Sequence, residues 1–108
     1  MEFKTLTLTY IQNNYVSLVE FNRCALYQIT NRLAILRINS NVSAMPHNTE
    51  VKIASLPFHV YDYSNFIAHA QGSPAHFNVA VSGTNIQLAN YSGIALGGWV
   101  RVPLVLFK

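Results

Sequence analysis

The stretch from His76 to Ala89 reads His-Phe-Asn-Val-Ala-Val-Ser-Gly-Thr-Asn-Ile-Gln-Leu-Ala and decides the fold class. Its first six residues alternate between polar or small side chains and larger apolar ones, and its last five do the same. Alternation of period 2, bounded by Gly, Asn and Ser, is typical of a β-strand with one buried face. Because Ser82-Gly83-Thr84 between the two runs indicates a turn, the stretch predicts a β-hairpin.

The first strand of this hairpin has an apolar side and a polar side. Phe77 and Val79 point one way, whereas His76 and Asn78 point the other, since successive side chains of a strand face opposite sides of the sheet. The apolar side packs into a core, so the polar side is the first place to look for function.

Similar short runs cover the rest of the chain. Polar loops are expected at Asn39–Asn48 and Phe58–Asn65, and Gly97-Gly98 is expected to break the pattern before the last strand. No apolar stripe at helical spacing with capping signals is evident, so no helix is predicted. About nine short strands predict one all-β domain over residues 1–108, an antiparallel β-sandwich or jelly-roll-like barrel. The expected strands are Thr5–Tyr10, Tyr15–Phe21, Cys24–Ile29, Leu33–Ile38, Glu50–Ser55, Phe66–His69, His76–Val81, Asn85–Ala89 and Trp99–Phe107.

The last strand is apolar on both of its sides, and so is the run Leu33–Ile38. One side fills the core, but a domain of this size has no second layer to cover the other. A subunit interface is the simplest cover. One row consists of Val100, Val102, Leu104 and Leu106; the other consists of Trp99, Pro103, Val105 and Phe107, interrupted only by Arg101.

The composition narrows the function classes. Apolar residues make up 51% of the chain and charged residues 10%, against about 25% charged in ordinary globular proteins. The net charge of +3 comes from scattered Lys and Arg with no basic run, so we expect no nucleic-acid partner. No apolar window has the length of a membrane helix, so we expect no membrane insertion. Cys24 is the only cysteine, which leaves neither an intramolecular disulfide nor a zinc cluster.

Three motifs together resemble a known family. The first is a strand ending in Leu-Pro, Ile53-Ala54-Ser55-Leu56-Pro57, followed by an aromatic-rich connection. The second is His76-Phe77-Asn78-Val79 before a Ser-Gly turn, and the third is Gly98-Trp99 near the end of the chain. From Tyr15 to Lys108 the chain resembles the C-terminal head domain of phage tail-fibre and baseplate receptor-binding proteins, from phages of Gram-positive bacteria.

The resemblance implies both a setting and a ligand. Heads of this family are homotrimers of antiparallel β-sandwiches or barrels at the tail tip of the virion, joined to an upstream tail-fibre or baseplate segment. They bind saccharides of the host cell wall. By this resemblance His76 matches the family's sugar-binding His, and Asn78 stands where the family has Asp. The family's Trp position falls on Gln87 or Leu88, and Tyr91 is the replacement that we expect for this aromatic surface.

The residues themselves suggest two candidate sites. Sugar binding needs planar groups against C–H faces and amides or carboxylates for paired hydroxyls. If the hairpin forms, His76, Asn78 and Gln87 share its polar side; the alternative is an ordinary solvated sheet face. The second candidate is the loop His59–Asn65, whose alternative is a packed loop that covers an edge. Its candidate ligand-binding residues are Tyr61, Asp62 and Tyr63.

Catalysis has little support in the sequence. Glycoside cleavage commonly uses two carboxylates, and strand facing suggests no pair among Glu2, Glu20, Glu50 and Asp62. We therefore expect no enzyme and no cofactor. We also expect no metal site, because the four His residues lack the spacing of metal ligands. A threefold axis would be another way to gather three copies of one His around an ion. The function predicted is saccharide recognition by a trimeric phage head. The alternative is a structural trimerisation or capping module that ends a viral fibre and binds no ligand.

Overall fold

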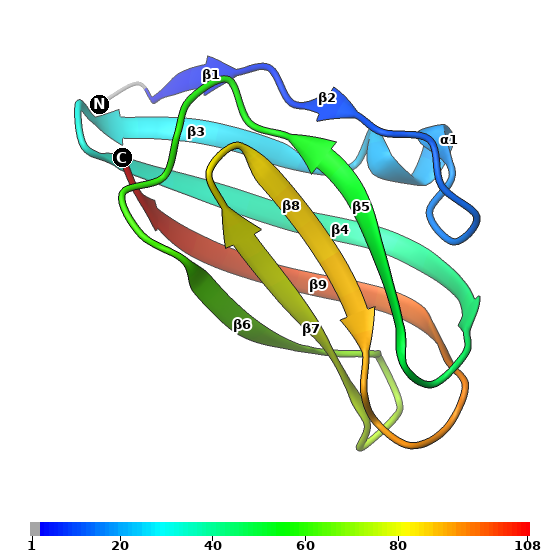
Figure 1. Ribbon diagram of the computed structural model, residues 1–108. Coiled ribbons are helices and arrows are strands. Elements are labelled where there is room, and N and C mark those ends of the chain that lie inside the picture. The colour runs from blue at the N-terminus through cyan, green and yellow to red at the C-terminus, as the bar shows by residue number, and fades with distance from the viewer. Residues whose placement is uncertain (1–2) are drawn as a thin grey trace.

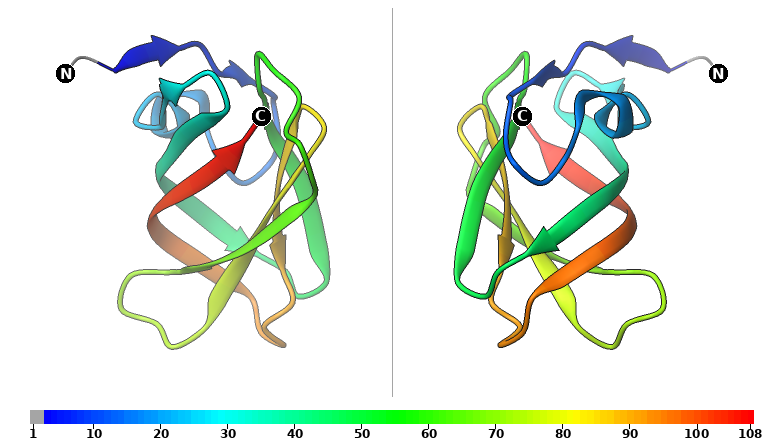
Figure 2. Two further views of the ribbon diagram at one scale, coloured as in Figure 1. Left: turned by 90° about the vertical axis from the view of Figure 1, so that its left-hand side faces the viewer. Right: turned by 90° about the vertical axis from the view of Figure 1, so that its right-hand side faces the viewer.

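The chain folds as a β-sandwich of two antiparallel sheets, which the computed structural model describes for residues 3–108 (Figure 1). Figure 2 shows the two layers from the side. The four-stranded sheet has the order β1 (Lys4–Leu6), β3 (Ala25–Thr30), β4 (Leu33–Met45) and β9 (Leu96–Phe107). The five-stranded sheet has the order β2 (Thr9–Tyr10), β5 (Thr49–Ser55), β8 (Asn85–Asn90), β7 (His76–Ser82) and β6 (Ser64–His69).

The five-stranded sheet contains a Greek key. Strands β6, β7 and β8 follow one another as neighbours, and β5 lies beside β8 rather than beside β6. This order is the Greek-key arrangement common in β-sandwiches. The all-β prediction is therefore confirmed, and so are the predicted strands at residues 24–29, 50–55, 66–69, 76–81, 85–89 and 99–107, with shifted ends.

The predicted strand Thr5–Tyr10 is wrong as a single element. Its first half is β1, which pairs with β3, and its second half is β2, which pairs with β5 in the other sheet. Strands at the corners of a sandwich often switch sheets at a bend, and this bend lies at Thr7-Leu8. Leu6 and Leu8 both pack against the core, so the period-2 pattern continues through the bend and conceals it.

The predicted strand Tyr15–Phe21 is also wrong, because the chain forms a short helix there, α1 (Leu18–Phe21). The Oγ of Ser17 accepts a hydrogen bond from the backbone N–H of Glu20, 3.3 Å away. Ser17 and Glu20 have the spacing of a capping box, S-x-x-E, which starts a helix by satisfying free N–H groups. The prediction that the chain has no helix overlooked this signal.

The predicted loop Asn39–Asn48 is mostly strand. β4 continues to Met45 and pairs with β9 along its length, from Leu33 opposite Phe107 to Met45 opposite Leu96. Asn and Ser have weak strand preferences, but a long partner strand satisfies their backbone groups. The predicted break at Gly97-Gly98 lies inside β9. A Cβ on Gly97 would stand 2.8 Å from the carbonyl oxygen of Val42, so only glycine fits where the two strands pass.

The core lies between the sheets and is built by the inward rows of both. Phe77, Val79 and Val81 of β7 are fully buried, and Leu104 and Leu106 of β9 in the other sheet belong to the same buried cluster. Burial of these aliphatic and aromatic side chains supplies most of the stabilisation of such a domain.

The outer face of the four-stranded sheet is apolar at one end. Val105 and Phe107 of β9 are 46% and 62% exposed, and they pair with Ile35 and Leu33 of β4. The prediction that these strands carry apolar side chains on both of their sides is confirmed for this end of the sheet. We call this surface the apolar patch; it comprises Tyr27, Leu33, Ile35, Val105 and Phe107.

Candidate functional site

The outward side chains of the five-stranded sheet form a continuous surface, the polar face. Asn78 of β7 lies opposite Ala89 of β8, which in turn lies opposite Glu50 of β5. One row further along, Ala80 lies opposite Gln87, and Gln87 opposite Lys52. β6 adds an outer row beyond β7. The polar face thus comprises Glu50, Lys52, Asn65, Ile67, His69, His76, Asn78, Ala80, Gln87 and Ala89, with Tyr63 and Tyr91 at its margins.

The hairpin that presents these residues has the predicted geometry. Ser82 pairs with Asn85, which leaves Gly83 and Thr84 as a two-residue turn. Gly83 has φ of 59°, as a type II′ turn requires at its first central position. This register keeps Phe77 and Ile86 inside and leaves Asn78 and Gln87 outside.

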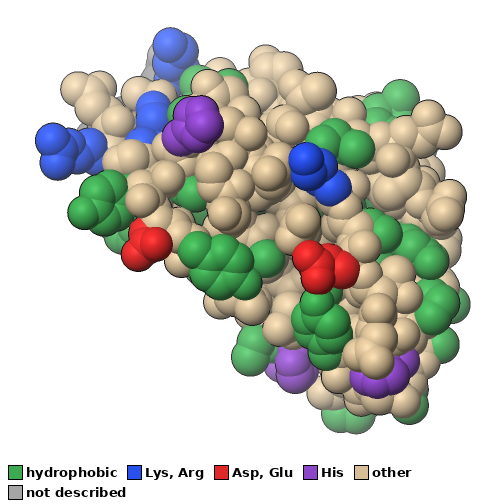
Figure 3. Space-filling model, in the orientation of Figure 1, with side chains coloured by type: hydrophobic (Ala, Val, Ile, Leu, Met, Phe, Trp, Pro, Cys, Tyr) green, Lys and Arg blue, Asp and Glu red, His purple; other side chains and the backbone are tan. Residues whose placement is uncertain are grey.

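Asn78 and Gln87 occupy diagonal positions on neighbouring strands. Side chains in such positions lie about 7–8 Å apart, so one ligand can contact both. Within residues 3–108 neither side chain forms a hydrogen bond with another protein group. Their cross-strand partners Ala80 and Ala89 are small, so no large side chain protrudes from the sheet directly opposite either amide. The face is largely uncharged, with hydrophobic groups and isolated charges among neutral polar atoms (Figure 3).

Tyr91 lies just beyond β8, and its hydroxyl donates a 2.6 Å hydrogen bond to a carboxylate oxygen of Glu50. This hydrogen bond is the main reason why the pKa of Tyr91 is raised above its ordinary value, with burial and the charges of Glu50 and Tyr63 adding to it. Glu50 thereby becomes part of the polar face. Glu50 is not among the residues predicted for this face, because nothing local in the sequence shows that β5 pairs with β8.

His76 pairs across the strands with His69, a residue that is not part of the predicted site. The two imidazole rings lie edge to face with centroids 5.7 Å apart. Their position at one end of the face gives it two further donors or acceptors beside Asn78.

The predicted loop site is divided by the structure. Tyr63 is 58% exposed, and its hydroxyl accepts a hydrogen bond from the amide of Asn65 on the polar face. Asp62 accepts a hydrogen bond from the backbone N–H of Tyr63. Tyr61, by contrast, is 83% exposed beside Phe107, with which it shares a shallow depression of about 230 Å³ lined also by Arg32 and Lys108. Tyr63 thus joins the first candidate site, and Tyr61 does not.

Each side-chain carboxylate among residues 3–108 contacts a different group. Glu20 lies 3.8 Å from Arg23, Glu50 binds Tyr91, and Asp62 caps its own loop; Glu2 lies outside the described residues. In the same part of the chain no three His, Cys, Asp or Glu side chains converge as metal ligands. Nor does any helix there have the length and hydrophobicity to cross a bilayer.

No protein-family model matches the sequence, and no curated protein is significantly similar to it. The resemblance to phage head domains therefore rests on the three motifs alone. What the domain does has to be argued from the two outer faces of its sandwich.

Proposed function

We propose that this domain is a receptor-binding head of a phage tail fibre or baseplate, and that its polar face binds a saccharide of the host cell surface. The observation that carries the proposal is the pair Asn78 and Gln87. Two amides stand on central strands, outward, and without a hydrogen-bonding partner among residues 3–108.

An amide pair of this kind suits a sugar. Each amide offers two donors and an acceptor with two lone pairs, which match the adjacent hydroxyls of a pyranose. Central strands of a packed sheet hold these groups with little freedom to lose on binding. Tyr91 and Tyr63 supply aromatic surfaces at the margins of the face.

The charge of the face favours a neutral saccharide. Glu50 and Lys52 alternate on the outer side of β5 and carry opposite charges, so they largely cancel. The carboxylate of Glu50 is already an acceptor for Tyr91. Asn78 stands where phage heads of this kind have an acid, and an amide keeps the acceptor while removing the charge.

The proposal includes a homotrimer of jelly-roll-like heads, held at a virion tail tip by an upstream fibre or baseplate segment. The apolar patch supports assembly because exposed apolar surface of this kind usually marks an interface. The patch and the polar face lie on opposite sheets, so assembly through the patch leaves the polar face open. Three weak sites acting together would bind a cell surface far more tightly than one.

The test is a glycan array probed with the isolated protein, followed by titration of the best ligand. Asn78→Ala and Gln87→Ala should each weaken binding about threefold to tenfold, since a net hydrogen bond is worth roughly 0.5–1.5 kcal/mol. Asn41→Ala is the matched control, because Asn41 is an exposed strand residue on the opposite sheet. Unchanged affinity of both polar-face variants would refute the site.

The divided loop offers a second matched pair. Tyr63→Ala should weaken binding, whereas Tyr61→Ala should leave it unchanged, because only Tyr63 adjoins the polar face. Both side chains are more than half exposed, so neither variant should lower the melting temperature by more than a few degrees. An equal loss of binding in the two variants would mean that the whole loop, and not Tyr63 alone, contributes to the site.

The apolar patch also supports the alternative function, a structural module that trimerises or caps a viral fibre and binds no ligand. The two functions differ at the polar face. A capping module should assemble through the patch yet show no glycan binding, and the Asn78 and Gln87 variants should then have no phenotype.

A further inference from the structure

We infer that the outer face of the four-stranded sheet carries a second site, which binds a tetrahedral oxyanion, a phosphate or sulfate group, between Arg37 and Arg101. This site lies on the sheet opposite the polar face, and its chemistry is ionic rather than neutral. The inference does not depend on saccharide binding at the polar face.

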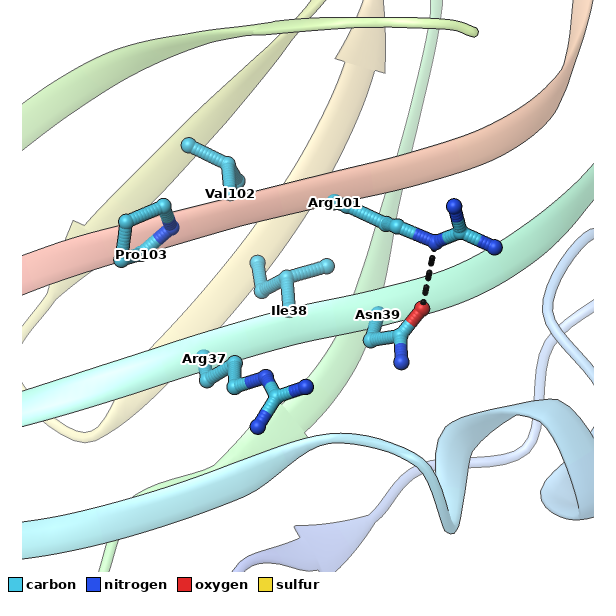
Figure 4. Close-up of a pocket in the computed structure, with 6 residues that line it drawn as sticks. All are labelled: Arg37, Ile38, Asn39, Arg101, Val102 and Pro103. Atoms are coloured by element: carbon cyan, nitrogen blue, oxygen red, sulfur yellow. Dashed lines mark hydrogen bonds between the residues drawn. The ribbon is translucent and has the colours of Figure 1, made fainter.

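The two arginines lie on neighbouring strands in diagonal positions. Arg37 of β4 pairs with Pro103, and Arg101 of β9 pairs with Asn39 two residues along. Diagonal side chains of this kind begin about 7–8 Å apart, which two long guanidinium side chains readily span. Both arginines line a depression of about 190 Å³, and Figure 4 shows the side chains around it. It is lined by Arg37, Ile38, Asn39, Arg101, Val102 and Pro103.

Arg101 is held in place before any ligand arrives. Its Nε donates to the amide oxygen of Asn39 at 3.2 Å, and a terminal nitrogen donates to Gln71 at 3.4 Å. The guanidinium also lies 5.2 Å from the ring centroid of Trp99, over which Arg23 lies at 4.9 Å. Contacts to aromatic rings and neutral acceptors orient the cation without neutralising it.

Within residues 3–108 neither Arg37 nor Arg101 has a carboxylate partner. The acidic side chain in an ion pair with an arginine of this region is Glu20, which lies beside Arg23. Asp62 and Glu50 are engaged elsewhere. The depression therefore has positive charge on two sides and an amide, Asn39, between the two guanidinium groups in Figure 4.

The geometry selects the shape of the anion. A guanidinium pairs with two oxygens at once through its planar fork. The oxygens of a tetrahedral phosphate or sulfate point in different directions and can meet two forks that approach from different sides, whereas the two oxygens of a carboxylate lie in one plane and meet two such forks less well. The depression is smaller than the pockets of about 300–1,000 Å³ that enclose whole ligands, so it takes the charged group and leaves the rest of the molecule outside.

The test is an NMR titration of the arginine side-chain Nε–H signals of the full chain with sodium phosphate, sulfate and acetate at constant ionic strength. The signals of Arg37 and Arg101 should shift and saturate with phosphate and sulfate, with at least about tenfold weaker binding of acetate. Glucose 6-phosphate and glucose 6-sulfate should bind like their inorganic ions. The tighter of the two indicates whether the natural ligand carries phosphate or sulfate.

Substitutions complete the test. Arg37→Gln should weaken phosphate binding at least about tenfold, as expected for the loss of charge-assisted hydrogen bonds. Arg101→Lys keeps the charge but loses the fork and should also weaken it. Lys52→Gln removes the same charge from the opposite sheet and should change the affinity less than twofold. An equal loss in the Lys52 variant, or equal binding of acetate and phosphate, would overturn the inference.

Discussion

The outer faces of the two sheets share the same strand alternation and carry different chemistry. On the five-stranded sheet the outward positions of β7 and β8 hold amides, imidazole and alanine. On the four-stranded sheet the outward positions of β4 and β9 hold aliphatic and aromatic residues at one end, and Arg37 and Arg101 follow further along the two strands. The inner faces are alike, because both must fill one core. Function is therefore expected where the two sheets differ, on their outer faces.

The difference also separates assembly from recognition. An apolar face gains free energy by leaving water, whatever covers it. A face of amides gains little from burial unless each donor and acceptor finds a partner. The apolar patch is thus suited to a large dry contact and the polar face to a ligand rich in hydroxyls.

The largest expected effect tests the alternation itself at adjacent residues of β7. Phe77 is fully buried, whereas His76 lies on the polar face. Phe77→Ala should lower the free energy of unfolding by about 3–5 kcal/mol, and His76→Ala by less than about 1 kcal/mol. Chemical denaturation of the two variants measures both. Similar losses would mean that β7 does not present its polar side outward. If His76 contacts the ligand, its variant should also bind host cells or glycan more weakly.

A smaller loss is expected at the end of β8, where a polar residue points inward. Asn90 is fully buried; its amide nitrogen donates to the carbonyl oxygens of Met45 and Ile94, each at 2.7 Å. Asn90→Ala leaves these carbonyls without that donor and should cost about 1–3 kcal/mol. Asn85→Ala, at the outward start of the same strand, should change stability by less than about 0.5 kcal/mol. Thermal melts of the two variants make the comparison.

The comparison of the two outer faces is sharpened by placing one charge on each. Val105→Lys puts an ammonium group in the apolar patch, and Ile67→Lys puts one on the polar face, where Ile67 is 59% exposed. Folding should change little in either. Light scattering should show the homotrimer for the parent and Ile67→Lys, and a 12.1 kDa monomer for Val105→Lys. A monomeric parent would remove the case for assembly through the patch.

The smallest effect concerns Tyr91 and Glu50 at high pH. Because the hydrogen bond to Glu50 raises the pKa of Tyr91 above its unfolded value of 10.0, the resulting stability is present below pH 10 and is lost as the pH rises through the folded pKa. Tyr91→Phe should abolish that loss. Absorbance titration of tyrosinate should show that Tyr91→Phe removes a contribution at the high-pH end of the curve. Loss of a contribution near pH 10 instead would mean that the hydrogen bond does not form.

One of the wrong predictions had a local signal against it in the sequence, and the others had none. The Ser17–Glu20 capping box was present in the sequence, and an apolar run around it outweighed it. The switch between sheets at Thr7-Leu8 had no local signal, since the alternation continues through it. The extension of β4 through Asn39–Met45 depends on β9, more than fifty residues away in the chain. Local preference cannot reveal a partner at that separation.

The sequence by itself determined the sides of β7, β8 and β9, because side-chain direction in a strand depends only on position along it. It likewise determined the hairpin at Gly83, where the turn residues are adjacent. Only the tertiary structure decided which strands are neighbours. That choice brought Glu50 to Tyr91 and Arg37 to Arg101, and it separated Tyr61 from Tyr63. Pairing between distant strands depends on how two sheets share one core, and no short window of residues contains that information.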